Sequence, residues 1–139
     1  MKQPNYNISI LVVDDDAMVR TVMVEYLVSF GFRKIHQAKN VPQAVKFIQD
    51  PKIKIDLILS DWEMPGAKGL DLLKTVRKSP HRKHTPFIMV TSQESIERFK
   101  ITQAAQWRVT EYMIKPFTSD LLKDRLWKVM GWSDEAAAI

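Results

Sequence analysis

Ile8-Ser9-Ile10-Leu11-Val12-Val13-Asp14-Asp15-Asp16 is the stretch that decides the fold class. It begins as an apolar run broken only by Ser9, which is typical of a strand covered on both faces in a parallel sheet. The aspartates end that strand, and from residue 18 apolar side chains recur with helical spacing as far as Gly31, a residue suited to the position after a helix. The stretch therefore predicts a buried strand followed by a helix that packs on the sheet.

The same strand–helix unit recurs along the chain. Further strands are predicted at residues 34–38, 55–60, 87–90 and 112–114. Helices are predicted at residues 18–30, 41–48, around Leu70 to Val76, 93–106 and 121–130. Five such units with short connections predict an α/β fold, an open, doubly wound parallel sheet with helices on both faces. We expect a single domain, residues 1–139, with its core in residues 7–131 and a frayed tail from residue 133.

The composition excludes several classes of protein. The chain has 139 residues, 45% of them hydrophobic, and no cysteine, which excludes a disulfide scaffold, a thiolate zinc site and a cysteine nucleophile. We find neither a membrane span nor a signal peptide in the sequence, so a cytoplasmic location is expected. The net charge of +5 points to an acidic partner, either protein or nucleic acid.

The polar residues that follow four of the predicted strands carry the functional signal. Asp14 and Asp15 follow the first strand, Asp61 the third, Thr91 the fourth and Lys115 the fifth. The carboxyl ends of parallel strands meet at one edge of the sheet, and ligands bind there. These five side chains are therefore expected to converge in one pocket.

The chemistry of that pocket favours phosphoryl transfer. Carboxylates close together repel one another unless a cation relieves them, and an oxygen-rich acidic pocket suits Mg²⁺. A lysine and a hydroxyl beside the metal would bind phosphoryl oxygens, and Asp61 would be the nucleophile, because carboxylates form acyl phosphates. Two simpler explanations are an aspartate run that stabilises a helix N-terminus and an Asp61 that is only a solvated turn residue. The expected convergence of four separate segments outweighs both.

Four segments closely resemble the receiver domain of response regulators in the CheY-like superfamily. They are Ile10-Leu11-Val12-Val13-Asp14-Asp15, Leu57-Ile58-Leu59-Ser60-Asp61-Trp62-Glu63-Met64-Pro65-Gly66, Met89-Val90-Thr91-Ser92 and Tyr112-Met113-Ile114-Lys115-Pro116-Phe117. The resemblance covers about residues 7–131. It implies a flavodoxin-like fold with five strands in the order 2-1-3-4-5.

The resemblance also implies a metal site and an acceptor. Asp61 would be the phosphoacceptor, taking its phosphoryl group from the phosphohistidine of a sensor histidine kinase. Asp14, Asp15 and Asp61, with the backbone carbonyl of Glu63, would bind Mg²⁺. Lys115 would pair with the phosphoryl oxygens, and its bond to the next residue, a proline, would be cis.

A switch is implied as well. Thr91 would bind the phosphoryl group, and Tyr112 would change rotamer as Thr91 moves. The face made by the fourth helix, fifth strand and fifth helix would then bind a downstream protein target. A phosphatase is a further expected partner. Such a chain is a phosphoacceptor signalling protein with Mg²⁺-dependent self-phosphorylation and autodephosphorylation, and it is not a processive enzyme.

Three positions depart from the commonest family pattern. Arg108-Val109 stands where a Gly-Ala pair is frequent, and Lys68 stands where an acid is frequent. Glu63 occupies a variable position that influences dephosphorylation. None of these removes a required group, so they affect phosphoryl lifetime and partner choice.

Other features are interpreted structurally. The basic residues at 74–84 are interpreted first as cations at a helix end followed by a solvated loop. Docking to an acidic partner is the second interpretation, and binding to nucleic acid is the third. Met18 and Trp127 are expected in the core. Trp107 and Trp132 are expected to be partly exposed. Trp62 adjoins Asp61 and would report on the metal site.

The preferred hypothesis is a stand-alone, monomeric, chemotaxis-type response regulator, because few residues follow the last helix. A phosphorelay intermediate is the alternative within the same class. A Mg²⁺ phosphatase of the haloacid dehalogenase type, with Asp14 as nucleophile, is the rival from another class, but it leaves Asp61 unexplained. DNA binding has only the net charge in its favour.

Overall fold

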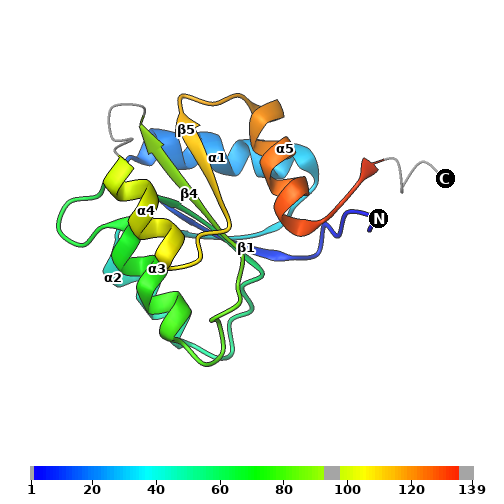
Figure 1. The fold of residues 1–139 in the computed structure, drawn as a ribbon. Coiled ribbons are helices and arrows are strands. Elements are labelled where there is room, and N and C mark those ends of the chain that lie inside the picture. Colours follow the sequence, from blue (N-terminus) through cyan, green and yellow to red (C-terminus); the bar gives the residue numbers. More distant parts are fainter. Residues whose placement is uncertain (1, 93–97, 135–139) are drawn as a thin grey trace.

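The computed structural model describes residues 2–92 and 98–134. Five parallel strands form one sheet in the order β2-β1-β3-β4-β5, as predicted, and helices lie on both sides of it (Figure 1). The strands are β1 (Ser9–Val13), β2 (Lys34–Ala38), β3 (Leu57–Asp61), β4 (Phe87–Ser92) and β5 (Glu111–Lys115). The helices are α1 (Ala17–Phe30), α2 (Val41–Gln49), α3 (Gly69–Lys78), α4 (Arg98–Gln106) and α5 (Ser119–Met130). None of the helices in the described ranges has the length and hydropathy needed to span a bilayer.

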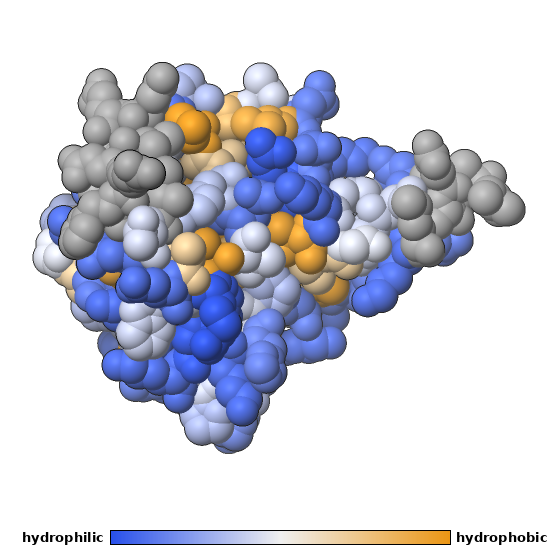
Figure 2. Space-filling model, viewed as in Figure 1, coloured by the Kyte–Doolittle hydropathy of each residue, from blue (hydrophilic) through white to orange (hydrophobic). Residues whose placement is uncertain are grey.

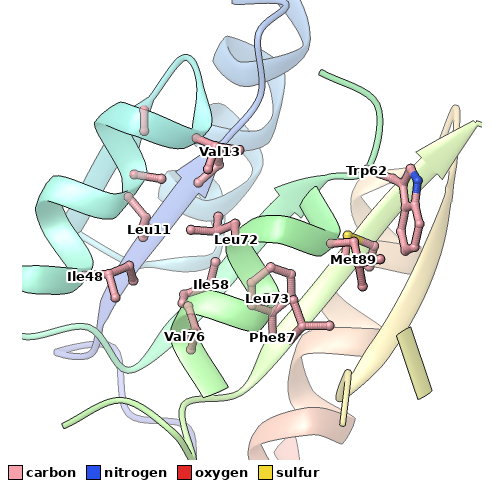
Figure 3. Close-up of a cluster of buried hydrophobic side chains, with 14 of the residues drawn as sticks. Leu11, Val13, Ile48, Ile58, Trp62, Leu72, Leu73, Val76, Phe87 and Met89 are labelled. Atoms are coloured by element: carbon pink, nitrogen blue, oxygen red, sulfur yellow. The ribbon is translucent and has the colours of Figure 1, made fainter. Parts of the chain in front are cut away.

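Successive side chains of the central strands point to opposite faces of the sheet. Leu11 and Ile58 join one buried cluster, which Figure 3 shows, together with residues of α2 and α3. Val12 and Leu59 join a second cluster with residues of α1 and α5. This alternation explains why the central strands have no polar face, because both of their faces are covered.

The ends of the helices follow the capping chemistry of the sequence. The side chain of Asp16 accepts hydrogen bonds from the backbone N–H groups of Met18 and Val19, so only the last aspartate of the run is a helix cap. Gly31 follows α1 with a φ of 116°, which favours glycine over any L-residue. Thr118 caps α5, as predicted.

Three expectations need correction or limitation. Met18 was expected in the core but is 80% exposed, because it lies in the first turn of α1 beyond the covered sheet. The tail was expected to fray from residue 133, yet the Ser133 N–H donates to the Lys2 carbonyl and the Trp127 indole donates to Asp134. The helix predicted at 93–106 is helical from Arg98, and residues 93–97 lie outside the described part of the chain.

The basic segment is not simply solvated, because Arg77 and Arg82 are buried. The Arg82 guanidinium donates to backbone carbonyls at and beyond the end of α2, those of Phe47, Ile48, Asp50 and Ile53. A cation at a helix C-terminus satisfies carbonyls that have no partner inside the helix. Arg82 therefore fixes the loop before β4 to α2, at the end of the sheet opposite Asp61.

Candidate functional site

The residues expected to converge do lie at one edge of the sheet. Asp61 is the last residue of β3, and Lys115 is the last residue of β5. Thr91 of β4 is aligned with Ile114, next to Lys115, and Asp14 directly follows β1. The parallel register thus brings four segments to the carboxyl edge, as the sequence predicted.

Asp14 lies at the bottom of the site. Its side chain is fully buried, and one carboxylate oxygen accepts a hydrogen bond from the Asp16 N–H at 2.9 Å. The other oxygen accepts from the Lys115 ammonium, also at 2.9 Å. Both oxygens are therefore engaged by the protein, and a buried carboxylate held in this way has a fixed orientation.

Asp61 lies beside the same lysine. Its Oδ1 is 3.2 Å from Lys115 Nζ and accepts a hydrogen bond from the Glu63 N–H at 3.3 Å. Burial and the neighbouring Asp14 raise the pKa of Asp61 to about 6, although Lys115 acts in the opposite direction. The nearby carboxylates in turn raise the pKa of Lys115. In the described part of the chain, Oδ2 of Asp61 accepts no hydrogen bond from the protein.

The three carboxylates that were expected to bind a metal form one cluster. Oxygen atoms of Asp14, Asp15 and Asp61 lie within 4.8 Å of one another. Asp15 is exposed and the other two are buried, so the cluster is open to water on one side only. This donor set fits Mg²⁺, which binds carboxylate oxygens and keeps several water ligands.

The expected switch residues lie on β4 and β5, the two strands at one end of the strand order. Thr91 is buried in β4, and its hydroxyl is 3.4 Å from the Ser92 carbonyl. Tyr112 of β5 is aligned with Met89 and is partly buried, which raises the pKa of its hydroxyl. The bond between Lys115 and Pro116 is cis, as expected.

Trp62 is buried rather than exposed beside the site. The residue is 3% exposed, and it joins the cluster between the sheet and α3 (Figure 3). Figure 3 shows it next to Met89, at the end of that cluster. Trp62 is thus adjacent in sequence to Asp61, while its ring is part of the buried cluster.

Two features of the site were missed by sequence reasoning. A Cβ added at Gly69 would clash with the backbone oxygen of Asp61, so only glycine allows α3 to begin this close to the end of β3. An open apolar groove of about 550 Å³ lies beside Lys115, between Met18, Val22 and Tyr26 of α1 and the turn at Phe117. Met18 was expected in the core, so the sequence did not predict a groove lined by this exposed side chain.

Comparison with known proteins identifies the family. A model of the response regulator receiver domain matches residues 10–127. The chain belongs to the response regulator receiver family. Its relatives and its fold place it with the CheY-like receiver domains.

Similar proteins include chemotaxis proteins. Chemotaxis protein CheY-3 of Vibrio cholerae is 37% identical over 125 residues, which cover 90% of this chain and 93% of the relative. Chemotaxis protein CheY of Pseudomonas aeruginosa is 36% identical over 120 residues, covering 86% and 94%. The solved structure of the chemotaxis response regulator CheY4 of Vibrio cholerae matches with a TM-score of 0.79 and 28% identity, covering 88% of this chain and 98% of that one.

Proposed function

We propose that this receiver domain accepts a phosphoryl group on Asp61 from the phosphohistidine of a sensor histidine kinase. The observation that supports this most directly is the environment of Asp61. It is a buried carboxylate with one oxygen paired with Lys115 and Glu63, while the other takes no hydrogen bond from the described residues. That free oxygen is suited to attack phosphorus, with the P–N bond to imidazole breaking as the acyl phosphate forms.

The remaining residues have distinct roles in this proposal. Asp14, Asp15 and Asp61, with the backbone carbonyl of Glu63, would bind Mg²⁺, which would neutralise charge on the phosphoryl oxygens. Lys115 is already held by Asp14 at 2.9 Å, so its ammonium is oriented before a phosphoryl group arrives. Thr91 would donate its hydroxyl to a phosphoryl oxygen from the neighbouring strand.

The switch would act through the surface made by α4, β5 and α5. Figure 1 shows β5 between these two helices. Movement of Thr91 towards the phosphoryl group would free space for the Tyr112 ring, which packs against the cluster beneath α3 and α4. Exposed Ile114, on β5, offers an apolar contact for a downstream protein target. A phosphatase would end the signal.

We infer a chemotaxis-type role, as a single monomeric domain over residues 1–139 that acts in the cytoplasm. The similarity to chemotaxis proteins along nearly their whole length supports this role over that of a phosphorelay intermediate. The haloacid dehalogenase-type alternative is disfavoured, because the family match is to the response regulator receiver domain and Asp61 would have no role in that alternative.

The experiment is labelling with radioactive acetyl phosphate in the presence of Mg²⁺. We expect alkali-labile label on the wild type and on Asp124→Asn, an exposed carboxylate control, but none on Asp61→Asn. Asp14→Asn should keep the acceptor but label slowly, because it weakens the metal site and Lys115. Full labelling of Asp61→Asn with loss in Asp14→Asn would instead support Asp14 as the nucleophile.

A further inference from the structure

The positive charge of the chain is concentrated in one segment. Residues 72–110 contain eight of the 21 Lys and Arg residues but only two of the 16 Asp and Glu residues, Glu94 and Glu97. That segment has a net charge of +6, so the rest of the chain carries −1. Both acids fall within 93–97, outside the described residues. The excess therefore belongs to α3, α4 and the loops that follow them.

A tryptophan lies among these cations. The ammonium of Lys74 is 5.5 Å from the centre of the Trp107 ring, and that of Lys78 is 5.2 Å from it. These lysines are four residues apart on α3, an arrangement in which like charges repel. Trp107 is only partly buried, so the ring and both ammonium groups reach the surface together.

Buried Arg77 connects the segments that carry these cations. Its buried guanidinium donates to the carbonyls of Lys83 and Thr85 in the loop before β4, and to those of Trp107 and Arg108 after α4. One side chain thus connects α3 to both neighbouring loops. The backbone carbonyls of exposed Lys83 and Arg108 are consequently bound by the same guanidinium that binds the Trp107 carbonyl.

Arg108 itself is in an unfavourable conformation. Its φ is 56°, and its N–H donates to the Ala105 carbonyl while the Val109 N–H donates to the Ala104 carbonyl. This is a Schellman motif, in which glycine is favoured at the position that Arg108 occupies. A cation is therefore present where backbone conformation favours a residue without a side chain.

These cations, exposed except for the half-buried Lys74, also lack acidic partners in the described residues. In residues 2–92 and 98–134, no carboxylate forms an ion pair with Lys74, Lys78, Lys83 or Arg108. By contrast, Lys123 and Lys128 of α5 pair with Asp134 and Glu111. We call the set of Lys74, Lys78, Lys83, Trp107 and Arg108 the basic α3–α4 surface. Figure 2 shows the region over α3 and α4 as mostly hydrophilic.

We propose that the basic α3–α4 surface binds an acidic segment of a partner protein that carries an aromatic or large apolar side chain. Carboxylates would pair with the free cations, and the apolar side chain would pack on the Trp107 ring. Two neighbouring lysines and an arginine with a positive φ each lower the stability of the protein locally, and such local losses of stability are typical of a functional surface. Trp107 and Arg108 directly follow α4, so this surface adjoins the one made by α4, β5 and α5, although its five residues lie outside those elements.

An acidic protein segment fits better than nucleic acid or an anionic membrane. Specific nucleic-acid sites contact many phosphates over a large area, whereas this surface offers four described cations, of which only Lys74 and Lys78 are at the Trp107 ring. An amphipathic helix that binds a membrane buries its apolar face in the lipid, but the apolar side of α3 is already buried in the core.

The test uses acetyl-Glu-Asp-Glu-Leu-Phe-Glu-Asp-Glu-amide as the probe, with Gln and Asn in place of its acids in a control peptide. Tryptophan fluorescence and amide NMR shifts are followed on titration of the full chain at about 0.1 M salt. Lys74→Glu with Lys78→Glu should weaken binding at least about tenfold. Lys52→Glu with Lys54→Glu, an equal charge change on exposed lysines elsewhere, should change it less than about threefold. Trp107→Phe should remove the fluorescence response.

Several outcomes would overturn the proposal. They are an absence of saturable peptide binding, equal binding of the control peptide, and equal effects of the two lysine pairs. Duplex DNA or phosphatidylglycerol vesicles that bind more tightly than the peptide, and lose binding in Lys74→Glu with Lys78→Glu, would assign the surface to nucleic acid or membrane instead. Acetyl-phosphate labelling of Asp61 should be unchanged in that variant, which checks its fold and separates this proposal from the proposed phosphorylation.

Discussion

Replacing Asp61 by asparagine is expected to stabilise the metal-free protein at neutral pH. The Asp61 side chain is only 6% exposed, and burial with the nearby Asp14 raises its pKa to about 6. In the unfolded chain the pKa of an aspartate is about 3.9, and each pKa unit corresponds to about 1.4 kcal/mol. Ionisation of Asp61 therefore lowers the free energy of unfolding by about 3 kcal/mol, and asparagine removes that cost.

The pH range follows from the direction of the pKa change. Between about pH 4 and pH 6 the folded state binds more protons at Asp61 than the unfolded state does, so stability falls as the pH rises. The favourable contribution of protonated Asp61 is complete below about pH 4 and lost above about pH 6. The difference between Asp61→Asn and wild type should accordingly be near zero at pH 4 and reach its full value by about pH 7.

Urea unfolding in EDTA, followed by circular dichroism across this pH range, measures the difference. Asp124→Asn is the matched control, because Asp124 is exposed and its loss should change stability by less than about 0.5 kcal/mol. Mg²⁺ should stabilise the wild type by mass action and narrow the gap to Asp61→Asn. A pH-independent difference, or destabilisation of Asp61→Asn at pH 7, would refute the electrostatic reasoning.

Three further substitutions test the surroundings of the site. Gly69→Ala should destabilise the protein by about 3 kcal/mol or more in urea unfolding, because its Cβ would clash with the Asp61 backbone, whereas Ala67→Gly should have little effect. Arg82→Met should cost about 3 kcal/mol by leaving backbone carbonyls without donors, and near-wild-type stability would show that water replaces the guanidinium. Mg²⁺ should alter tryptophan fluorescence in the wild type but not in Trp62→Phe, and an unchanged response there would assign the signal to another tryptophan.

The sequence predicted the parts of the fold that depend on local pattern. Buried strands are recognised in the sequence as apolar runs. Because the final residues of parallel strands share one edge of the sheet, the convergence of Asp14, Asp61 and Lys115 followed from strand positions alone. The strand order required the family resemblance, because periodicity does not say which strands are neighbours. The aspartate run was resolved only by the structure, in which Asp16 caps α1 and Asp14 lies in the pocket.

The missed features depend on long-range contacts. Met18 fits the apolar stripe of α1, but the stripe does not show where the sheet stops covering the helix. Arg77 and Arg82 appear solvated in a basic segment, yet they are buried because carbonyls from distant loops surround them. Nothing local to an arginine reveals those partners. Gly69 likewise gains its importance from the approach of α3 to Asp61.

Arg108→Gly separates the stability of the basic α3–α4 surface from its binding. Glycine should stabilise the protein by about 1 kcal/mol, because the φ of Arg108 favours a residue without a Cβ. Arg108→Ala removes the same charge but keeps the Cβ, so it should give no such gain. Both variants should bind the acidic peptide more weakly than the wild type, since each loses one cation. If Arg108→Gly and Arg108→Ala proved equally stable, the φ of Arg108 would not be what lowers the free energy of unfolding. A more stable glycine variant with weaker binding would mean that this chain keeps an arginine in a strained position for the sake of its partner.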